Sequence, residues 1–150
     1  MSQWCGRVGG VTSWADVTRE APEFAARVRR LFDARKHKTM ATVRSDGSPR
    51  ISGIELSFAD GELRFGSMAR SVKGYDLNRD PRLAVHSPTV DPPHDDPGGW
   101  PGEAKIAGRA ISDSDGFRVD ITEVVLTSVA GLLVIESWHP GRGYERRERD

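Results

Sequence analysis

The sequence predicts a mainly β protein with a few short helices, whose strands close into a small barrel. Seven or eight short segments have the alternation or apolar content of strands, and only two or three segments have a helical pattern. The chain also has 16 glycines and 9 prolines, which favour frequent turns. A sheet of so many short strands must close on itself or protect its edges, and a small barrel does this most economically.

The helical signals lie in three places. The sequence Ser13-Trp-Ala-Asp16 has the form of a capping box and predicts a helical turn. A longer helix is expected from Pro22, where proline suits a first helical position. That helix has an apolar stripe that should cover one face of the sheet, formed by Phe24, Val28, Leu31 and Phe32. A third, short helix is expected over 72–79, ending before Pro81.

The strands predicted from alternation and turn signals are 39–44, 50–59, 62–67, 83–87, 103–111, 117–122, 124–129 and 132–139. Residues 88–102 form a long proline- and glycine-rich loop. Residues 1–12 carry no periodicity and should be a loosely ordered arm. Residues 144–150 interleave both charges, which is typical of a solvated tail. All 150 residues are therefore expected to form one domain around one core.

The amino-acid composition restricts the classes of partner and the cellular compartment that we expect for the protein. Lysine plus arginine equals aspartate plus glutamate, 22 each, so no net charge would recruit nucleic acid or acidic lipid. The single cysteine, Cys5, excludes an internal disulfide and a multi-cysteine metal site. No apolar run approaches the ~20 residues of a membrane span, and the N-terminus lacks the apolar core of a signal peptide. We expect a cytoplasmic protein without nucleic-acid or membrane partners.

One stretch, residues 65–75, concentrates polar groups between a strand and a helix. Ser67, Arg70, Ser71 and Lys73 lie within seven residues. Ser71 suits the N-cap, and the amides and dipole of a helix N-terminus favour an anion. Two interpretations stay open: a phosphate pocket, or an ordinary capped helix with solvated basic residues.

A metal site is the weaker interpretation of the other polar cluster. His94 lies near Asp91, Asp95 and Asp96, but the spacing is irregular and the four residues share a proline-rich loop. We therefore predict no metal site.

The order of segments resembles a known superfamily. The segments that carry the resemblance are Thr39-Met-Ala-Thr-Val-Arg-Ser-Asp-Gly-Ser-Pro-Arg-Ile-Ser52, Leu63-Arg-Phe-Gly-Ser67, Arg70-Ser-Val-Lys73 and Leu77-Asn-Arg-Asp-Pro-Arg-Leu-Ala-Val85. They resemble the pyridoxamine 5′-phosphate oxidase-like split β-barrel superfamily, and in particular its flavin- and deazaflavin-dependent oxidoreductases. The resemblance covers residues 22–87 and a closing segment, 117–143.

The resemblance implies an FMN-binding type of split β-barrel, a homodimer with its cofactor in a groove between the two barrels. The cofactor would be FMN or a deazaflavin coenzyme. Ser71 and Lys73 would hold its phosphate, with Arg70 and Val72 beside them. Contacts to the ring and ribityl chain would come from Ser67 and from the strand with Arg50 and Ser52. Trp138 and Arg142 would complete the site, often from the partner subunit.

Two departures from the superfamily pattern affect the expected function. Val72 stands where pyridoxamine phosphate oxidases have the arginine of Ser-Arg-Lys, and the C-terminal Arg-Leu-x-Pro ending is absent. Both argue against pyridoxamine phosphate oxidation itself. The resemblance implies a flavin- or deazaflavin-dependent oxidoreductase that reduces a small organic substrate, with no catalytic residue identified. The alternatives are a non-catalytic flavin, deazaflavin or haem carrier of the same fold, and a structural domain with an empty groove.

Overall fold

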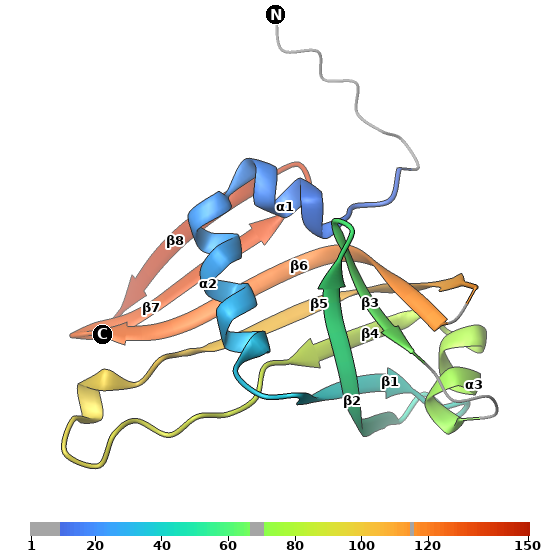
Figure 1. The fold of residues 1–150 in the computed structure, drawn as a ribbon, viewed down its shortest axis with the longest axis horizontal. Coiled ribbons are helices and arrows are strands. Elements are labelled where there is room, and N and C mark those ends of the chain that lie inside the picture. Colours follow the sequence, from blue (N-terminus) through green and yellow to red (C-terminus); the bar gives the residue numbers. More distant parts are fainter. Residues whose placement is uncertain (1–9, 67–70, 115) are drawn as a thin grey trace, which may run out of the picture.

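The computed structural model describes residues 10–66, 71–114 and 116–150 (Figure 1). The helices are α1 (Trp14–Glu20), α2 (Pro22–Asp33) and α3 (Val72–Arg79), with a 3-10 turn, η1, at Pro97–Gly99. The strands are β1 (His37–Val43), β2 (Pro49–Ala59), β3 (Glu62–Gly66), β4 (Arg82–His86), β5 (Glu103–Asp113), β6 (Gly116–Ala130), β7 (Leu132–His139) and β8 (Gly143–Arg149). The three predicted helices are confirmed, and so is the mainly β class.

The sheet closes into a six-stranded barrel. The strand order is β3-β2-β1-β4-β5-β6-β7-β8, and β3 also pairs with β6. All of these pairings are antiparallel. The start of β6 closes the barrel on β3, where Phe65 pairs with Phe117, and the end of β6 pairs with β7. The barrel expected from the strand count is thus confirmed, with β7 and β8 extending the sheet beyond it.

Strand β6 is longer than predicted. Two strands, 117–122 and 124–129, are predicted from the sequence, whereas the structure has one strand of 15 residues. The prediction was wrong because Thr122 and Glu123 are both exposed, which interrupts the alternation. The register shifts opposite them, between Ala107 and Gly108, as in a β-bulge. A Cβ on Gly108 would lie 2.3 Å from the Asp120 carbonyl oxygen, so glycine is required there.

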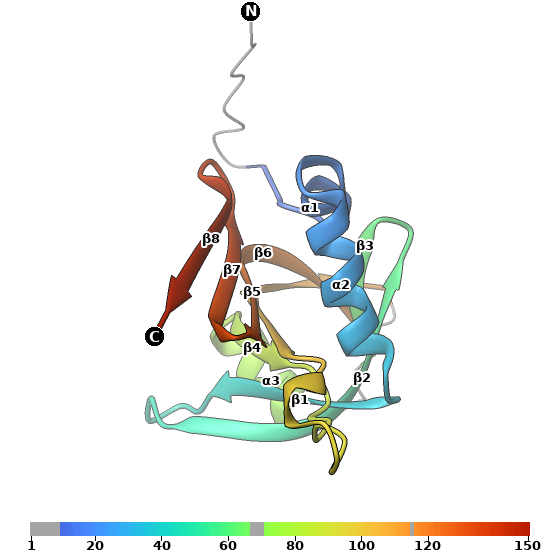
Figure 2. The ribbon, with the colours of Figure 1, turned by 90° about the vertical axis from the view of Figure 1, so that its left-hand side faces the viewer.

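Helices α1 and α2 cover the barrel between β3 and the β7–β8 hairpin (Figure 2). The capping box of α1 is present, since Ser13 Oγ accepts from the Asp16 amide at 3.3 Å and Asp16 Oδ2 accepts from the Ser13 amide at 2.9 Å. The Trp14 ring lies 4.7 Å from the Phe58 ring. In the predicted stripe of α2, Phe24, Val28 and Phe32 are buried and Leu31 is partly buried.

A buried ion pair connects α2 to the last two strands. Glu136 on β7 accepts hydrogen bonds from the Arg27 guanidinium and from the Tyr144 hydroxyl. Glu136 is only 3% exposed. Burial alone would raise the pKa of Glu136, but the hydrogen bonds from Arg27 and Tyr144 bring it below the usual value.

Strand β8 replaces the charged tail expected over 144–150. It pairs with β7 in register from Leu133↔Arg149 to His139↔Gly143. Its outward residues are charged and exposed, as the sequence suggested. The prediction of a tail was wrong because β8 has no apolar alternation of its own, and the strand is ordered by β7 and by Tyr144 against Phe24.

The N-terminal arm is described only from residue 10; residues 1–9, with Cys5, lie outside the described residues. Two hydrogen bonds hold the end of this arm on β6. Thr12 N donates to Asp120 Oδ1 at 2.8 Å, and Ile121 N donates to Thr12 O at 2.9 Å. Thr12 is therefore anchored rather than loose. The predicted loop 88–102 is confirmed, apart from η1, and projects away from the barrel (Figure 1). Among the helices described, none has the length and apolar content needed to span a membrane.

Candidate ligand groove

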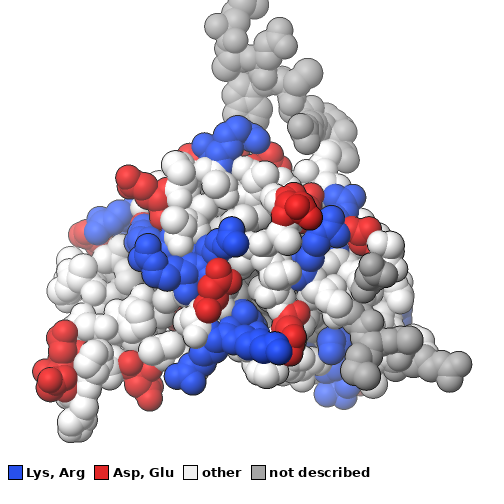
Figure 3. Space-filling view, in the orientation of Figure 1, with Lys and Arg blue, Asp and Glu red and all other residues white. Residues whose placement is uncertain are grey.

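A groove of about 1000 Å³ lies between the barrel wall and the start of α3. Its lining comes from the start of β1, from the middle of β2, from β3, from Lys73 and from the β5–β6 turn. Phe65 and Phe117 also line it, but their rings, stacked with centroids 5.3 Å apart, are buried in the hydrophobic core. Over the face seen in Figure 3, basic and acidic side chains are interspersed, in keeping with the zero net charge.

Helix α3 begins at one end of this groove. Ser71 is its N-cap, with extended backbone angles, and its Oγ accepts from the Gly74 amide at 3.2 Å. Lys73, in the first turn, lines the groove and is half-buried. The helix N-terminus therefore presents its positive dipole end and an ammonium group at the same end of the groove.

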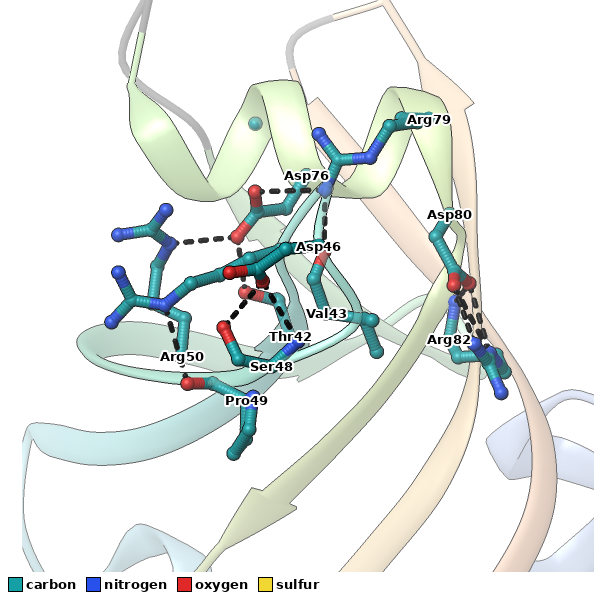
Figure 4. A network of polar contacts seen from close by, with 12 residues as sticks. Thr42, Val43, Asp46, Ser48, Pro49, Arg50, Asp76, Arg79, Asp80 and Arg82 are labelled. Carbon is teal, nitrogen blue, oxygen red and sulfur yellow. Dashed lines mark hydrogen bonds and ion pairs between the residues drawn. The ribbon is translucent and has the colours of Figure 1, made fainter.

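The position of α3 depends on one buried carboxylate, Asp76, which is 2% exposed (Figure 4). Its Oδ2 accepts from Thr42 Oγ1 at 2.8 Å and from Arg50 Nε at 2.7 Å. Its Oδ1 accepts from Arg79 Nη2 at 3.2 Å. Burial alone would raise the pKa of Asp76, but the hydrogen bonds from Arg50, Thr42 and Arg79 hold it below the usual value.

The same network ties α3 to the β1–β2 hairpin beneath it (Figure 4). Arg79 Nη2 also donates to the Val43 carbonyl at 2.6 Å, and Arg44 Nε donates to the Pro49 carbonyl at 3.3 Å. Arg44, Arg50 and Arg79 thus bring three guanidinium groups to this end of the barrel. Arg50 and Arg79 are both paired with Asp76, and these three arginines lie outside the groove lining.

Two glycines leave the groove wall bare. Gly53 on β2 and Gly66 on β3 both line the groove, and a Cβ on either would meet no described atom within 4 Å. Gly116 differs, since its Cβ would lie 2.4 Å from the Phe65 carbonyl oxygen at the barrel closure. Packing therefore requires glycine at Gly116 but not at Gly53 or Gly66, where the missing side chains open the groove to a ligand instead.

Ion pairs compensate most of the charges along the groove. Glu55 lies 3.6 Å from Lys36 Nζ and 3.5 Å from His37 Nε2. Arg64 pairs with Asp113, and the Arg64 guanidinium holds the pKa of that carboxyl below its usual value. In the part of the chain that the structure describes, Lys38 and Lys73 have no carboxylate within 4 Å, although both line the groove.

The predicted site residues fall into three groups. Lys73 lines the groove, with Ser71 and the exposed Val72 beside it at the start of α3. Arg50 and Ser52 point to the inner side of β2 below α3, where Ser52 pairs with Met40 and Arg50 is bound to Asp76. Ser67 and Arg70 lie outside the described residues.

The two C-terminal candidates lie elsewhere. Trp138 is 1% exposed and belongs to the hydrophobic core, so its ring does not form part of an accessible ligand surface. Arg142 lies in the β7–β8 turn, exposed, 4.0 Å from Glu145. That turn is on the opposite side of the molecule from α3 (Figures 1 and 2). The strand alternation of β7 turns the Trp138 ring inward with Val134 and Glu136.

Sequence reasoning missed Gly53, Gly66, Lys38 and Asp76. Gly53 had a usable signal, because a glycine inside a strand pattern often marks a close approach of backbone or ligand. Asp76 and Lys38 had none, because their burial arises from strands and helices brought together by the barrel. The predicted absence of a metal site is not contradicted: within the described ranges no group of three or more His, Cys, Asp or Glu could hold a metal ion.

No model of a known protein family matches the chain, and no curated protein sequence does either. Solved structures do match. A pyridoxamine 5′-phosphate oxidase-related, FMN-binding protein of Nostoc punctiforme matches with a TM-score of 0.61 at 12% identity, covering 87% of this chain and 96% of that one. The chain has the split β-barrel fold of these proteins.

Two further structures share the split barrel. PhzG from Burkholderia lata, solved with tetrahydrophenazine-1-carboxylic acid, matches with a TM-score of 0.58 at 16% identity, covering 87% of each chain. A heme-binding protein of Mycobacterium smegmatis matches with a TM-score of 0.54 at 12% identity, covering 81% of this chain and 86% of that one. At these identities the likeness extends to the fold.

Two other matches are partial. The match spans 51% of a conserved hypothetical protein of Mycobacterium tuberculosis, at 26% identity and a TM-score of 0.48. It spans 61% of an F420 reductase, at 20% identity and a TM-score of 0.44. These two matches cover 57% and 56% of the present chain.

Proposed function

We propose that this split barrel binds a phosphorylated flavin-type cofactor, FMN or a deazaflavin coenzyme, in the groove beside α3. We further propose that it is an oxidoreductase that reduces a small organic substrate. The observation that carries the proposal is the pairing of Lys73 at the start of α3 with the bare walls at Gly53 and Gly66. The first supplies a phosphate end, and the second supplies room for a flat ring.

The phosphate end combines two attractions. Lys73 supplies an ammonium group and lines the groove, and α3 supplies its N-terminal dipole. Each charged hydrogen bond to a phosphate contributes roughly 1.5–3 kcal/mol. Val72 is exposed and donates nothing from its side chain, so the phosphate is held by fewer side chains than in pyridoxamine phosphate oxidases.

The bound cofactor would supply the electron transfer, and the protein would supply binding, orientation and exclusion of water. The glycine positions let a planar ring approach the backbone of β2 and β3 closely. On this proposal, the groove residues bind and orient, and none of them acts as a nucleophile.

A homodimer is part of the proposal. Ile51, on the outer face of β2, is 76% exposed. It pairs across the sheet with Ala41, which pairs with Ala84 on β4, and Ala84 pairs with Ala107 on β5. Small apolar side chains therefore run across four strands next to a prominent isoleucine. A second copy packed on this strip would remove Ile51 from water and would border the groove, because neighbouring Gly53 lines it.

The test is titration of the purified protein with FMN and with the deazaflavin coenzyme, followed by absorption or fluorescence. Micromolar binding of one of them supports the proposal, and binding of neither contradicts it. Lys73→Ala should weaken that binding about tenfold or more. The matched control is Lys105→Ala on the outside of β5, which should bind as the wild type does.

Turnover separates the enzyme from a carrier. A reduced cofactor that is reoxidised by members of a substrate panel indicates an oxidoreductase. Tight binding without reduction or reoxidation would indicate a non-catalytic carrier of flavin or deazaflavin. A haem titration tests the third ligand class known for the fold, represented by the heme-binding protein of Mycobacterium smegmatis.

A further inference from the structure

The groove contains a second cationic site, built around Lys38. Lys38 is 7% exposed, which is rare for a lysine, because lysine is almost never fully buried unless its charge is paired. Its side chain lies on the inner face of β1 with Met40 and Thr42. The residue lines the groove. Lys38 is therefore a nearly buried lysine in the lining of a cavity, and the groups that its ammonium binds decide its role.

The partners of Lys38 within the described residues leave this charge uncompensated. Nζ donates to the Lys36 carbonyl at 3.1 Å, and no carboxylate of the described chain lies within 4 Å of it. An ammonium group has three N–H donors, so two remain for other acceptors. The nearby acidic group, Glu55, is engaged by Lys36 and His37.

The sum of the charges that line the groove also indicates that Lys38 lacks a compensating carboxylate. Glu55 compensates Lys36 and also contacts His37, and Asp113 compensates Arg64. Lys38 and Lys73 therefore remain as two excess positive charges in one cavity of a protein whose net charge is zero. One ligand phosphate at Lys73 would compensate only one of them.

The size of the groove also allows a second ligand group. Ligand cavities of about 300–1,000 Å³ hold one drug-sized molecule. The groove, at about 1000 Å³, lies at the upper limit of that range.

From these observations we infer that Lys38 is an anion-binding residue and that the substrate of this groove is an organic carboxylate, held by Lys38 while the cofactor phosphate is held by Lys73. The assignment of the substrate rests on the proposed function; the anion site itself does not. Lys38 binds and orients the carboxylate, and no bond is made or broken at its Nζ.

The experiment compares benzoate with its uncharged analogue benzamide on the full chain, by calorimetric titration and by thermal shift. The wild type should bind benzoate about tenfold or more tightly than benzamide. Lys38→Met, which keeps the length and apolar stem of the side chain, should abolish this preference. Lys73→Met and Lys105→Met should retain it, while Lys73→Met alone should weaken FMN. Should Lys38→Met fail to fold, Lys38→Gln provides the same comparison.

Two outcomes would overturn the inference: equal binding of benzoate and benzamide by the wild type, or an unchanged benzoate preference in a folded Lys38 variant. A Lys38 variant that weakens FMN as strongly as Lys73→Met does, without altering benzoate, would also overturn it, by placing Lys38 at the phosphate end. FMN binding is measured separately from benzoate binding. Loss of benzoate preference in a protein that never binds FMN would support the anion site and contradict the proposed cofactor.

Discussion

Arg50 Nε and Asp76 Oδ2 lie 2.7 Å apart, and this contact joins the inner face of β2 to the buried side of α3. Asp76 is also bound by Thr42 from β1 and by Arg79 from its own helix. The N-terminus of α3 therefore has a fixed position over the barrel end. Any ligand phosphate at Lys73 meets a helix start that the fold has already oriented.

Removing the Asp76 carboxylate should destabilise the protein strongly. Loss of one partner of a buried ion pair costs about 3–5 kcal/mol, and the partial exposure of Arg50 and Arg79 places the expected loss for Asp76→Ala near the lower end, about 3 kcal/mol. Urea denaturation measures this change. The control is Asp33→Ala, which breaks an exposed pair with Arg29 and should cost about 0–1 kcal/mol. Equal losses in the two variants would contradict the role given to Asp76.

Acid should destabilise the protein through the two carboxylates that are buried among the described residues. Asp76 and Glu136 both have a folded-state pKa below the ordinary values of 3.8 and 4.5. Their contribution is thus fully present above these ordinary values and is lost as the pH falls through the lower folded-state pKa. The unfolding free energy of the wild type should therefore decrease below about pH 4.

Replacement of the titrating group tests that assignment. Glu136→Gln should lower stability at neutral pH, because Arg27 loses its buried partner, and should make the acid decrease less steep. Denaturant titrations at several pH values measure both effects. Glu20→Gln, at an exposed position on α1, should retain the wild-type slope. A wild-type slope in Glu136→Gln would show that other groups control the acid transition.

A side chain at Gly53 should block the groove without disturbing the fold. A Cβ there meets no described atom within 4 Å, and valine suits a strand, so Gly53→Val should keep the thermal midpoint close to that of the wild type. Its affinity for the flavin cofactor should fall about tenfold or more because the ring loses its approach to the backbone. Gly108→Val is the contrasting variant: its Cβ would lie 2.3 Å from the Asp120 carbonyl, and it should unfold at a lower temperature. If Gly53→Val bound the cofactor as tightly as the wild type does, the cofactor ring would not lie against this wall.

The proposed dimer should depend on Ile51. Light scattering of the wild type should report twice the mass of one chain, and Ile51→Lys should shift it to the mass of a single chain, because a charge would be buried in the apolar strip. Leu132→Lys, also at an exposed apolar side chain but in the β6–β7 hairpin, should remain dimeric. A monomeric wild type would rule out the dimer, and a dimeric Ile51→Lys would move the interface to another face.

Much of the fold is predictable because its signals are local. The capping box at Ser13, the apolar stripe of α2 and the N-cap at Ser71 each depend on neighbours within a few residues, and each is present in the structure. The strand predicted from alternation over 50–59 is present as β2, where Ile54, Leu56 and Phe58 alternate on the buried face. Where local signals fail, so does the prediction: β6 is continuous despite a change of alternation at Thr122, and β8 is a strand despite its charged sequence.

Only part of the candidate site could be predicted from local sequence signals. The sequence alone determined the barrel class, the helix after β3 and the presence of Ser71 and Lys73 at its start, because these follow from periodicity, capping and residue spacing. Only the tertiary structure decided that Asp76 is buried against Arg50, that Trp138 lies in the core, and that Gly53 and Gly66 leave a groove bare. It also placed Lys38 and Lys73 along one cavity. The physical reason is that burial and charge compensation depend on strands far apart in the chain, which the closed barrel alone brings together.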